Sequence, residues 1–281
     1  MDKRFWMGLL LMSCVGAVSA GGPGAVRKQV ESSLLVKGTI DLHADGSVAG
    51  YALDKPDAVP EGIVGMIARA VPLWRFEPIE ITSGATRARA NMSMRIVAKK
   101  TDSGDFNVQI RGAQFFGQQR PGESVTSGKL RPPAYPDMAA RSGVGGTVYA
   151  VVKIGRDGRV EDAIVEQVNL RVISNARDME QWRAVLAKAA LRAVKDWTFN
   201  PPTTGEEVGK PYWAARVPIE FVAPDQRLPT EDKWESYVPG PRQTASWITQ
   251  DSGAEAADAL AGGGVYPVGT GPRLLTALNM P

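Results

Sequence analysis

The sequence has almost none of the residues that most catalytic and metal sites require. Its 281 residues include one cysteine, Cys14, and one histidine, His43. A lone cysteine forms no disulfide within the chain and excludes a cysteine-based zinc site. A single histidine removes most Ser-His-Asp and Cys-His arrangements, and His43 stands beside an Asp-Gly turn, where a hydrogen-bonded turn residue is the favoured interpretation. Neither a phosphate-binding loop followed by a lysine nor a nucleophile elbow occurs. We therefore expect no enzyme, no cofactor and no metal.

A marked excess of charge of one sign is also lacking. Lysine and arginine number 33 against 30 acidic residues, which gives a formal net charge of +3. A surplus this small, spread evenly along the chain, argues against a nucleic-acid partner.

The chain contains only one long apolar run, and it is short for a membrane span. Residues 5–18 follow a basic start and end near Val18-Ser19-Ala20, a small-residue cleavage site. A spanning helix needs about 20 apolar residues. The pattern predicts a signal peptide over residues 1–20, cleaved before Gly21, and a periplasmic protein.

Two alternatives to cleavage at this site stay open. The run could remain as an uncleaved inner-membrane anchor. Lipidation at Cys14 is the other alternative, because the preceding Leu-Met-Ser loosely resembles a bacterial lipoprotein box. Only these alternatives would attach the protein to a membrane.

One phrase occurs twice, and this repeat is the most informative feature of the chain. Asp45-Gly46-Ser47-Val48 leads through a helical stretch to Trp74-Arg75-Phe76-Glu77-Pro78, and Asp157-Gly158-Arg159-Val160 leads through a longer one to Trp197-Thr198-Phe199-Asn200-Pro201. A duplicated unit indicates two small modules of one fold. The Asp-Gly pairs predict hairpin turns, and the large aromatic residues predict core positions.

Hydrophobic periodicity predicts the same order of elements in both units. In the first unit, we expect strands over 34–42 and 48–53, a helix over 60–71, and strands over 88–98 and 106–113. In the second unit, we expect a helical turn over 137–141, strands over 147–154 and 160–168, a helix from an Asp178 N-cap to about 197, and a strand over 213–222. The strand over 106–113 has no counterpart in the second unit. We expect it to cover the edge of 88–98, so that only the second unit has an open edge.

These elements predict an α+β protein of two related modules, each a small antiparallel β-β-α-β sheet with its helix packed on one face. Residues 33–115 form the first module, residues 116–132 a linker, and residues 133–223 the second module. Residues 21–31 are expected to be a flexible lead. Residues 224–281, here called the tail, are rich in glycine and proline, so we expect them to be mostly disordered.

The second module resembles the TonB C-terminal domain. The resemblance rests on an ordered set of short motifs: Tyr135-Pro136, Gly146-Thr147-Val148, Asp157-Gly158-Arg159-Val160, Ala193-Val194-Lys195-Asp196-Trp197-Thr198-Phe199-Asn200-Pro201-Pro202 and Val217-Pro218-Ile219-Glu220-Phe221. Residues 33–98 look like a diverged copy. The resemblance implies a three-stranded antiparallel sheet with helices on one face and a periplasmic location. It also implies capture of a short segment of an outer-membrane receptor by strand addition at the last strand.

The resemblance and the strand pattern together nominate five partner-binding residues. Tyr135 and Pro136 would lie near the receptor, and packing within the module is an equally weighted alternative. Pro218 has no N–H, so its strand must lie at an edge with residue 218 pointing its backbone outward. Arg216 and Glu220 then point their backbone groups outward as well.

The function expected is a periplasmic TonB-like protein that binds an extended segment of an outer-membrane TonB-dependent receptor or another envelope protein, with a possible part in energy-dependent transport. The alternative is a structural or regulatory envelope protein without energy transduction. A full TonB couples to an ExbB–ExbD complex through an N-terminal helix carrying a histidine. Residues 5–20 hold no histidine, and only about 13 residues separate the signal from the first strand, so the sequence argues against coupling to an ExbB–ExbD complex in the usual way.

Overall fold

A computed structural model describes residues 22–81, 85–117, 120–224, 226–228, 230, 233–248 and 256–279. The expected signal peptide and Cys14 lie outside the described residues. Within these described ranges, no helix combines the length and the apolar character needed to cross a membrane.

The first module contains a twisted antiparallel sheet with one helix against it. The sheet runs in the order β10-β1-β3-β4, where β10 (Glu235–Tyr237) comes from the tail, and β2 also pairs with β1. Its elements are β1 (Glu31–Leu42), β2 (Val48–Leu53), α2 (Glu61–Ala70), β3 (Ala88–Lys100) and β4 (Phe106–Gly117), with 3-10 turns at Pro56–Ala58 and Val71–Leu73. The extra strand expected after residue 106 is confirmed, and it pairs along nearly all of β3.

The second module repeats this plan with a longer helix. Its sheet has the order β11-β9-β6-β7, where β11 (Tyr266–Pro267) comes from the tail. Its elements are α3 (Asp137–Arg141), β6 (Gly146–Ile154), β7 (Val160–Leu170), α4 (Ala176–Val194), β8 (Phe199–Asn200), a 3-10 turn at Glu206–Gly209 and β9 (Trp213–Phe221). In the preceding linker, β5 (Thr126–Ser127) pairs with β8.

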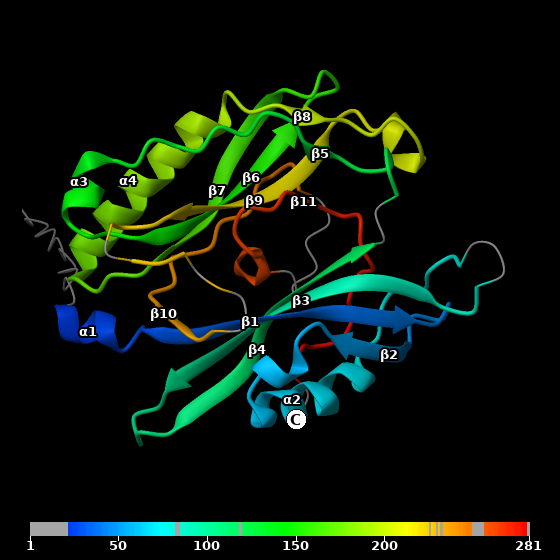
Figure 1. Cartoon of the computed structure of the whole chain (residues 1–281), viewed down its shortest axis with the longest axis horizontal. Helices are drawn as coiled ribbons and strands as arrows, with labels where there is room; N and C mark the ends of the chain where they lie inside the picture. Colours follow the sequence, from blue (N-terminus) through cyan, green and yellow to red (C-terminus); the bar gives the residue numbers. More distant parts are fainter. Residues whose placement is uncertain are drawn as a thin grey trace, which may run out of the picture.

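The protein therefore has the expected α+β fold with antiparallel sheets. The helices α2 and α4 lie on the outer faces, and the two sheets face each other across the tail (Figure 1). The 3-10 turn at Ala257–Ala259 lies between the sheets and contacts β3 and β4 on one side and β7 and β9 on the other. Each module keeps its own apolar core on the helix side of its sheet.

The repeated phrase takes the same place in both modules. Gly46 and Gly158 have positive φ angles of 80° and 76°. The N–H of Phe76 donates to the carbonyl of Gly46 at 2.9 Å, and the N–H of Phe199 donates to that of Gly158 at 2.8 Å. The aromatic residues of both phrases are buried, as their sequence predicts.

The expectation of a mostly disordered tail is wrong for the part of the tail that the structure describes. β10 (Glu235–Tyr237) pairs with β1, and β11 (Tyr266–Pro267) pairs with β9. The bridge between Leu170 and Val238 ties the same segment to the second module. Glycine and proline lower the propensity for regular structure, but the tail acquires its order from the two sheets it contacts.

The lead and the N-cap of α4 also differ from expectation. Residues 23–27 form α1 (Pro23–Arg27), and Val26 is buried in the core of the second module, not the first. The N-cap is Asn175, whose side chain accepts from the N–H of Asp178. Asp178 instead lies at the third helical position and accepts from the Asn175 amide at 2.8 Å. A capping side chain bonds two or three residues ahead, which explains the displacement.

Candidate functional site

The candidate docking edge is the outer side of β9, the last strand of the second module. Side chains alternate along this strand. Val217, Ile219 and Phe221 are buried in the core beneath α4. Those of Arg216 and Glu220 lie on the opposite face, where the two sheets meet.

The backbone of residue 218 points away from the sheet, which confirms the prediction from its missing N–H. Its carbonyl accepts from the N–H of Gly263 in the tail at 3.3 Å. Because neighbouring residues of a strand alternate, the backbone groups of Arg216 lie on the same outer side. On the inner side, β9 pairs with β6 from Gly146 to Ile154.

This edge is not open, which corrects the expectation of an uncovered strand. Tyr266 faces Arg216 and Pro267 faces Ala215 in the pairing of β11 with β9. The N–H of Val268 donates to the carbonyl of Ala214 at 2.9 Å. Residues 262–268, here called the cover, therefore lie along the expected docking edge.

The side chain of Arg216 cannot be offered to a partner in this conformation. Its Nε donates to an oxygen of Glu166 at 2.8 Å, and the two side chains are 2% and 0% exposed. Only the backbone of Arg216 remains a candidate contact. The two sheets face each other on this side of β9 (Figure 1), and this arrangement buries the pair.

Glu220 also has a structural role that its position on an edge strand did not predict. Its carboxylate forms an ion pair with Arg171 at 2.9 Å, with both side chains mostly buried. The hydroxyl of Thr147 donates to the same carboxylate at 2.9 Å. Substitution of Glu220 would therefore change the fold as well as the edge.

Tyr135 and Pro136 both make contacts within the second module, as the packing alternative expects. The hydroxyl of Tyr135 donates to the carbonyl of Val144 at 2.7 Å. Its ring lies 5.8 Å from the ring of Phe221, centroid to centroid. Pro136 is the N-cap residue of α3. These contacts fix the start of the module beside the end of β9, so docking by these two residues remains a prediction.

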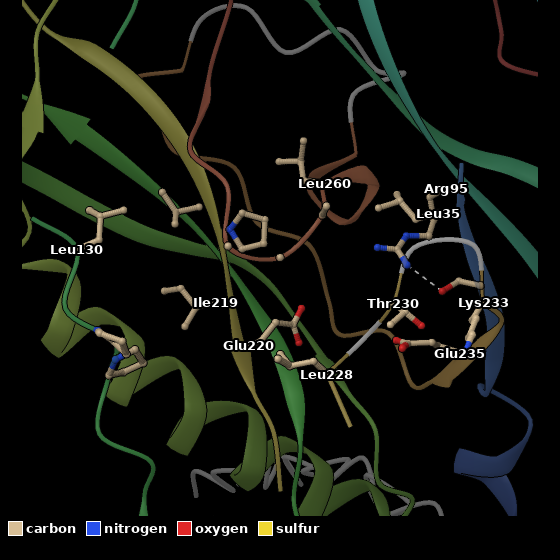
Figure 2. Close-up of a pocket in the computed structure, with 18 of the residues that line it drawn as sticks. Leu35, Arg95, Leu130, Ile219, Glu220, Leu228, Thr230, Lys233, Glu235 and Leu260 are labelled. Carbon is tan, nitrogen blue, oxygen red and sulfur yellow. Dashed lines mark hydrogen bonds between the residues drawn. The ribbon is translucent and has the colours of Figure 1, made fainter. Parts of the chain in front are cut away.

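A cavity of about 570 Å³ lies beside the covered edge, between the modules. Figure 2 shows apolar side chains on several sides of it, contributed by Leu35 of β1, Leu130 of the linker, Ile219 of β9 and Leu228 and Leu260 of the tail. Charged groups also line the cavity: Arg95, Lys233 and Glu235 lie together on one side of it, and Glu220 lies apart from them, beside Leu228 (Figure 2). An apolar cavity with a few polar groups is the usual form of a ligand or side-chain pocket.

Burial and neighbouring charges shift the pKa values of two of these groups, Glu235 and Arg95. Burial raises the pKa of the Glu235 carboxyl, and the charge of Glu220 acts in the same direction. Arg95 of β3 donates to three groups: the hydroxyl of Ser33 in the same module at 2.9 Å, the hydroxyl of Tyr149 in the second module at 3.4 Å and the carbonyl of Asp258 in the tail. These four residues, here called the polar layer, thus connect both sheets and the tail.

The second module is thus a small α+β domain whose last strand lies at a sheet edge that another extended segment can join. Residues 131–223 match the family model described as the Gram-negative bacterial TonB protein C-terminal. These residues belong to the TonB C-terminal family, as their motifs indicate. That family consists of non-enzymatic energy transducers and interaction proteins.

Curated relatives agree over the same part of the chain. "Protein TonB" of Xanthomonas campestris pv. campestris strain B100 is 32% identical over 97 residues, which cover 34% of this chain and 37% of the relative. The protein of the same name from strain ATCC 33913 gives the same values. The match therefore spans little more than a third of either protein.

A solved structure also aligns with part of the chain. The solution NMR structure of Pseudomonas aeruginosa TonB CTD aligns with 39% of this chain and 95% of its own, at 22% identity and a TM-score of 0.26.

Sequence reasoning missed the residues of the polar layer and the cavity. Ser33, Arg95, Tyr149 and Asp258 come from four separated segments, and no local pattern announces that they meet. One signal was available, since the tail contains Trp234, Tyr237, Trp247 and Tyr266. Aromatic residues favour burial, and Tyr237 is indeed 6% exposed.

Proposed function

We propose that this protein binds an extended segment of an outer-membrane receptor or another envelope protein by strand addition at β9. The observation that carries the proposal is that an extended segment, the cover, already pairs with this edge. On this proposal the cover occupies the place of the partner and must leave when the partner binds. The first module is on this view a diverged copy of the second, and the protein acts in the periplasm.

The cover is poorly suited to remain against a longer competing strand. Its ladder with β9 is two residues long. On the β9 side, Pro218 has no N–H to donate to the cover. Each backbone hydrogen bond contributes only about 0.5–1.5 kcal/mol net. A partner strand with more donors and acceptors can therefore replace the cover at little cost.

The cavity supports the same proposal, because it has room for the side chains of a partner strand. The part of the cover that borders it consists of Gly262 and Gly263, which bring no side chains to the space. A Cβ at Gly263 would meet nothing within 4 Å. A partner strand in the same place would direct its own side chains into this space. We therefore expect the partner segment to carry apolar side chains beside residues 218–220.

A reversible disulfide between the cover and β9 tests the proposal. The variant carries Ala214→Cys and Val268→Cys, at positions joined by a backbone hydrogen bond. Directly opposed residues of an antiparallel pair have Cα atoms about 4.5–5.5 Å apart, which a disulfide can span. The oxidised protein should lose its outer-membrane partner in a pull-down from envelope extracts, and reduction should restore binding.

Each single-cysteine variant serves as the control for the two substitutions. If the oxidised, locked protein retains the same partner as the reduced protein, strand addition at β9 is wrong.

Energy-dependent transport is the further part of the proposal, and it rests on the family alone. It requires coupling to a proton-driven complex of the ExbB–ExbD kind. Co-purification with such a complex would favour transport, whereas a stable envelope partner without it would favour the structural or regulatory role.

A further inference from the structure

The last described residues of the tail, 273–279, dock on the first module, and they are here called the C-terminal segment. They run antiparallel to the aromatic phrase of that module, with Leu274 opposite Phe76. The N–H of Glu77 donates to the carbonyl of Arg273 at 2.9 Å, and the N–H of Leu275 donates to that of Arg75 at 2.8 Å. The segment thus lies as an extra strand beside the phrase.

Side chains fix the segment at both ends. Leu274 is 5% exposed and belongs to the core of the first module. At the other end, the amide of Asn279 bonds both backbone groups of Ile110 in β4, at 2.9 Å and 2.8 Å. The indole N–H of Trp74 donates to the carbonyl of Leu278 at 3.2 Å.

The second module holds a different segment in the same register. The N–H of Gly128 donates to the carbonyl of Thr198, as the N–H of Leu275 does to that of Arg75. The indole N–H of Trp197 donates to the carbonyl of Arg131 at 2.7 Å. Ser127 pairs with Phe199 as Leu274 does with Phe76. Each residue of the C-terminal segment therefore matches a linker residue 147 positions earlier.

The two modules differ in where this extra strand comes from. In the second module, it is the linker that directly precedes the module. The residues that directly precede the first module take no such place, because Val26 packs in the core of the second module. In the first module, the place beside the aromatic phrase is taken by the C-terminal segment, which lies beyond the second module in the sequence.

We propose that the first module is a docking domain for the C-terminal segment, and that this docking holds the cover on β9. The segment acts as a latch. Its docking does not depend on the proposed function, whereas its effect on partner binding rests on it.

Chain connectivity provides the coupling. Only residues 269–272 separate the cover from the latch, so a docked latch keeps the cover within about 20 Å of its site. A short tether of this kind raises the local concentration of the cover to the millimolar range. Released from the latch, the cover would lose the tether at its C-terminal end. It would keep its short ladder, the bonds at Pro218 and Ala214, the ring contact of Tyr266 with Phe116 and its connection to the buried turn at Ala257–Ala259.

Amide exchange in the full-length protein tests the latch without any partner. The variant is Leu278→Ser with Asn279→Ala, and Asn107→Ala, exposed on the same strand β4, is the control. The amide of Leu275 reports on the latch, that of Arg216 on the cover, and that of Val217 on the β6–β9 ladder. We expect exchange at Leu275 and Arg216 to accelerate about tenfold or more, since two hydrogen bonds are lost, with Val217 and the control unchanged.

Every other result overturns the proposal. Faster exchange at Leu275 alone means that the latch opens without uncovering β9. Unchanged exchange at Leu275 means that these contacts do not hold the segment, and equal acceleration at Val217 means that the module itself unfolds. The variant should also capture more envelope partner than the parent. If Arg216 is uncovered and capture does not change, the latch stands and the proposed function fails.

Discussion

The backbone N–H of Phe76 donates to the carbonyl of Gly46, which brings the hairpin turn of the first module against its aromatic phrase. Gly46 has a φ of 80°, and a Cβ there would collide with the Phe76 carbonyl. Gly158 and Phe199 repeat the arrangement.

We therefore expect Gly46→Ala and Gly158→Ala each to destabilise the protein. The left-handed conformation alone costs a residue with a Cβ about 1–2 kcal/mol, and the collision adds to this. Urea unfolding measures the loss. Gly62→Ala, in α2 with nothing within 4 Å of its Cβ, is the control and should be neutral or stabilising. Equal effects at all three positions would contradict the role given to the turns.

Local patterns predicted the elements of both modules well. β2 (Val48–Leu53) and α3 (Asp137–Arg141) have the expected bounds. Alternation along a half-buried strand and helical spacing are properties of neighbouring residues, so the sequence carries them directly. The outward direction of the Pro218 backbone could also be predicted from the sequence, because proline has no N–H.

The arrangement of the tail could not be obtained from local patterns. Tyr266 pairs with Arg216, and Glu235 with Ser33, across long sequence separations. Segments that gain order only from contact with distant surfaces show no periodicity of their own. The burial of Arg216 against Glu166 has the same cause, because it needs both sheets and the tail in place.

The buried pair of Arg216 and Glu166 gives a second prediction. Removing one partner leaves an uncompensated buried charge, so Arg216→Met should cost about 3–5 kcal/mol of unfolding free energy. Adding Glu166→Leu should recover most of that loss, because a well-packed apolar pair often replaces a buried ion pair without penalty. Denaturant unfolding of both single variants and the double variant completes the cycle. Additive losses would contradict the coupling.

The processed N-terminus is a third prediction. The short apolar run and the Val18-Ser19-Ala20 site predict a mature protein that begins at Gly21. Intact mass of the protein from the periplasmic fraction measures this. A lipid-bearing species that starts at Cys14, or a membrane-bound species that retains Met1, would contradict it.

The last prediction concerns Glu235, which borders the cavity and pairs with Ser33 in the β1–β10 ladder. Burial raises the pKa of this carboxyl, and the nearby charge of Glu220 raises it further. A carboxyl with a raised folded-state pKa destabilises the fold when it is charged. This penalty is absent below the unfolded pKa of about 4.3 and develops as the pH rises through the folded pKa. Glu235→Gln should therefore raise the midpoint of thermal unfolding at pH 7 and leave it unchanged near pH 4. Glu206→Gln, at an exposed position, controls for the loss of one negative charge. A gain that is equal at both pH values would show that packing, and not the charge of Glu235, is responsible.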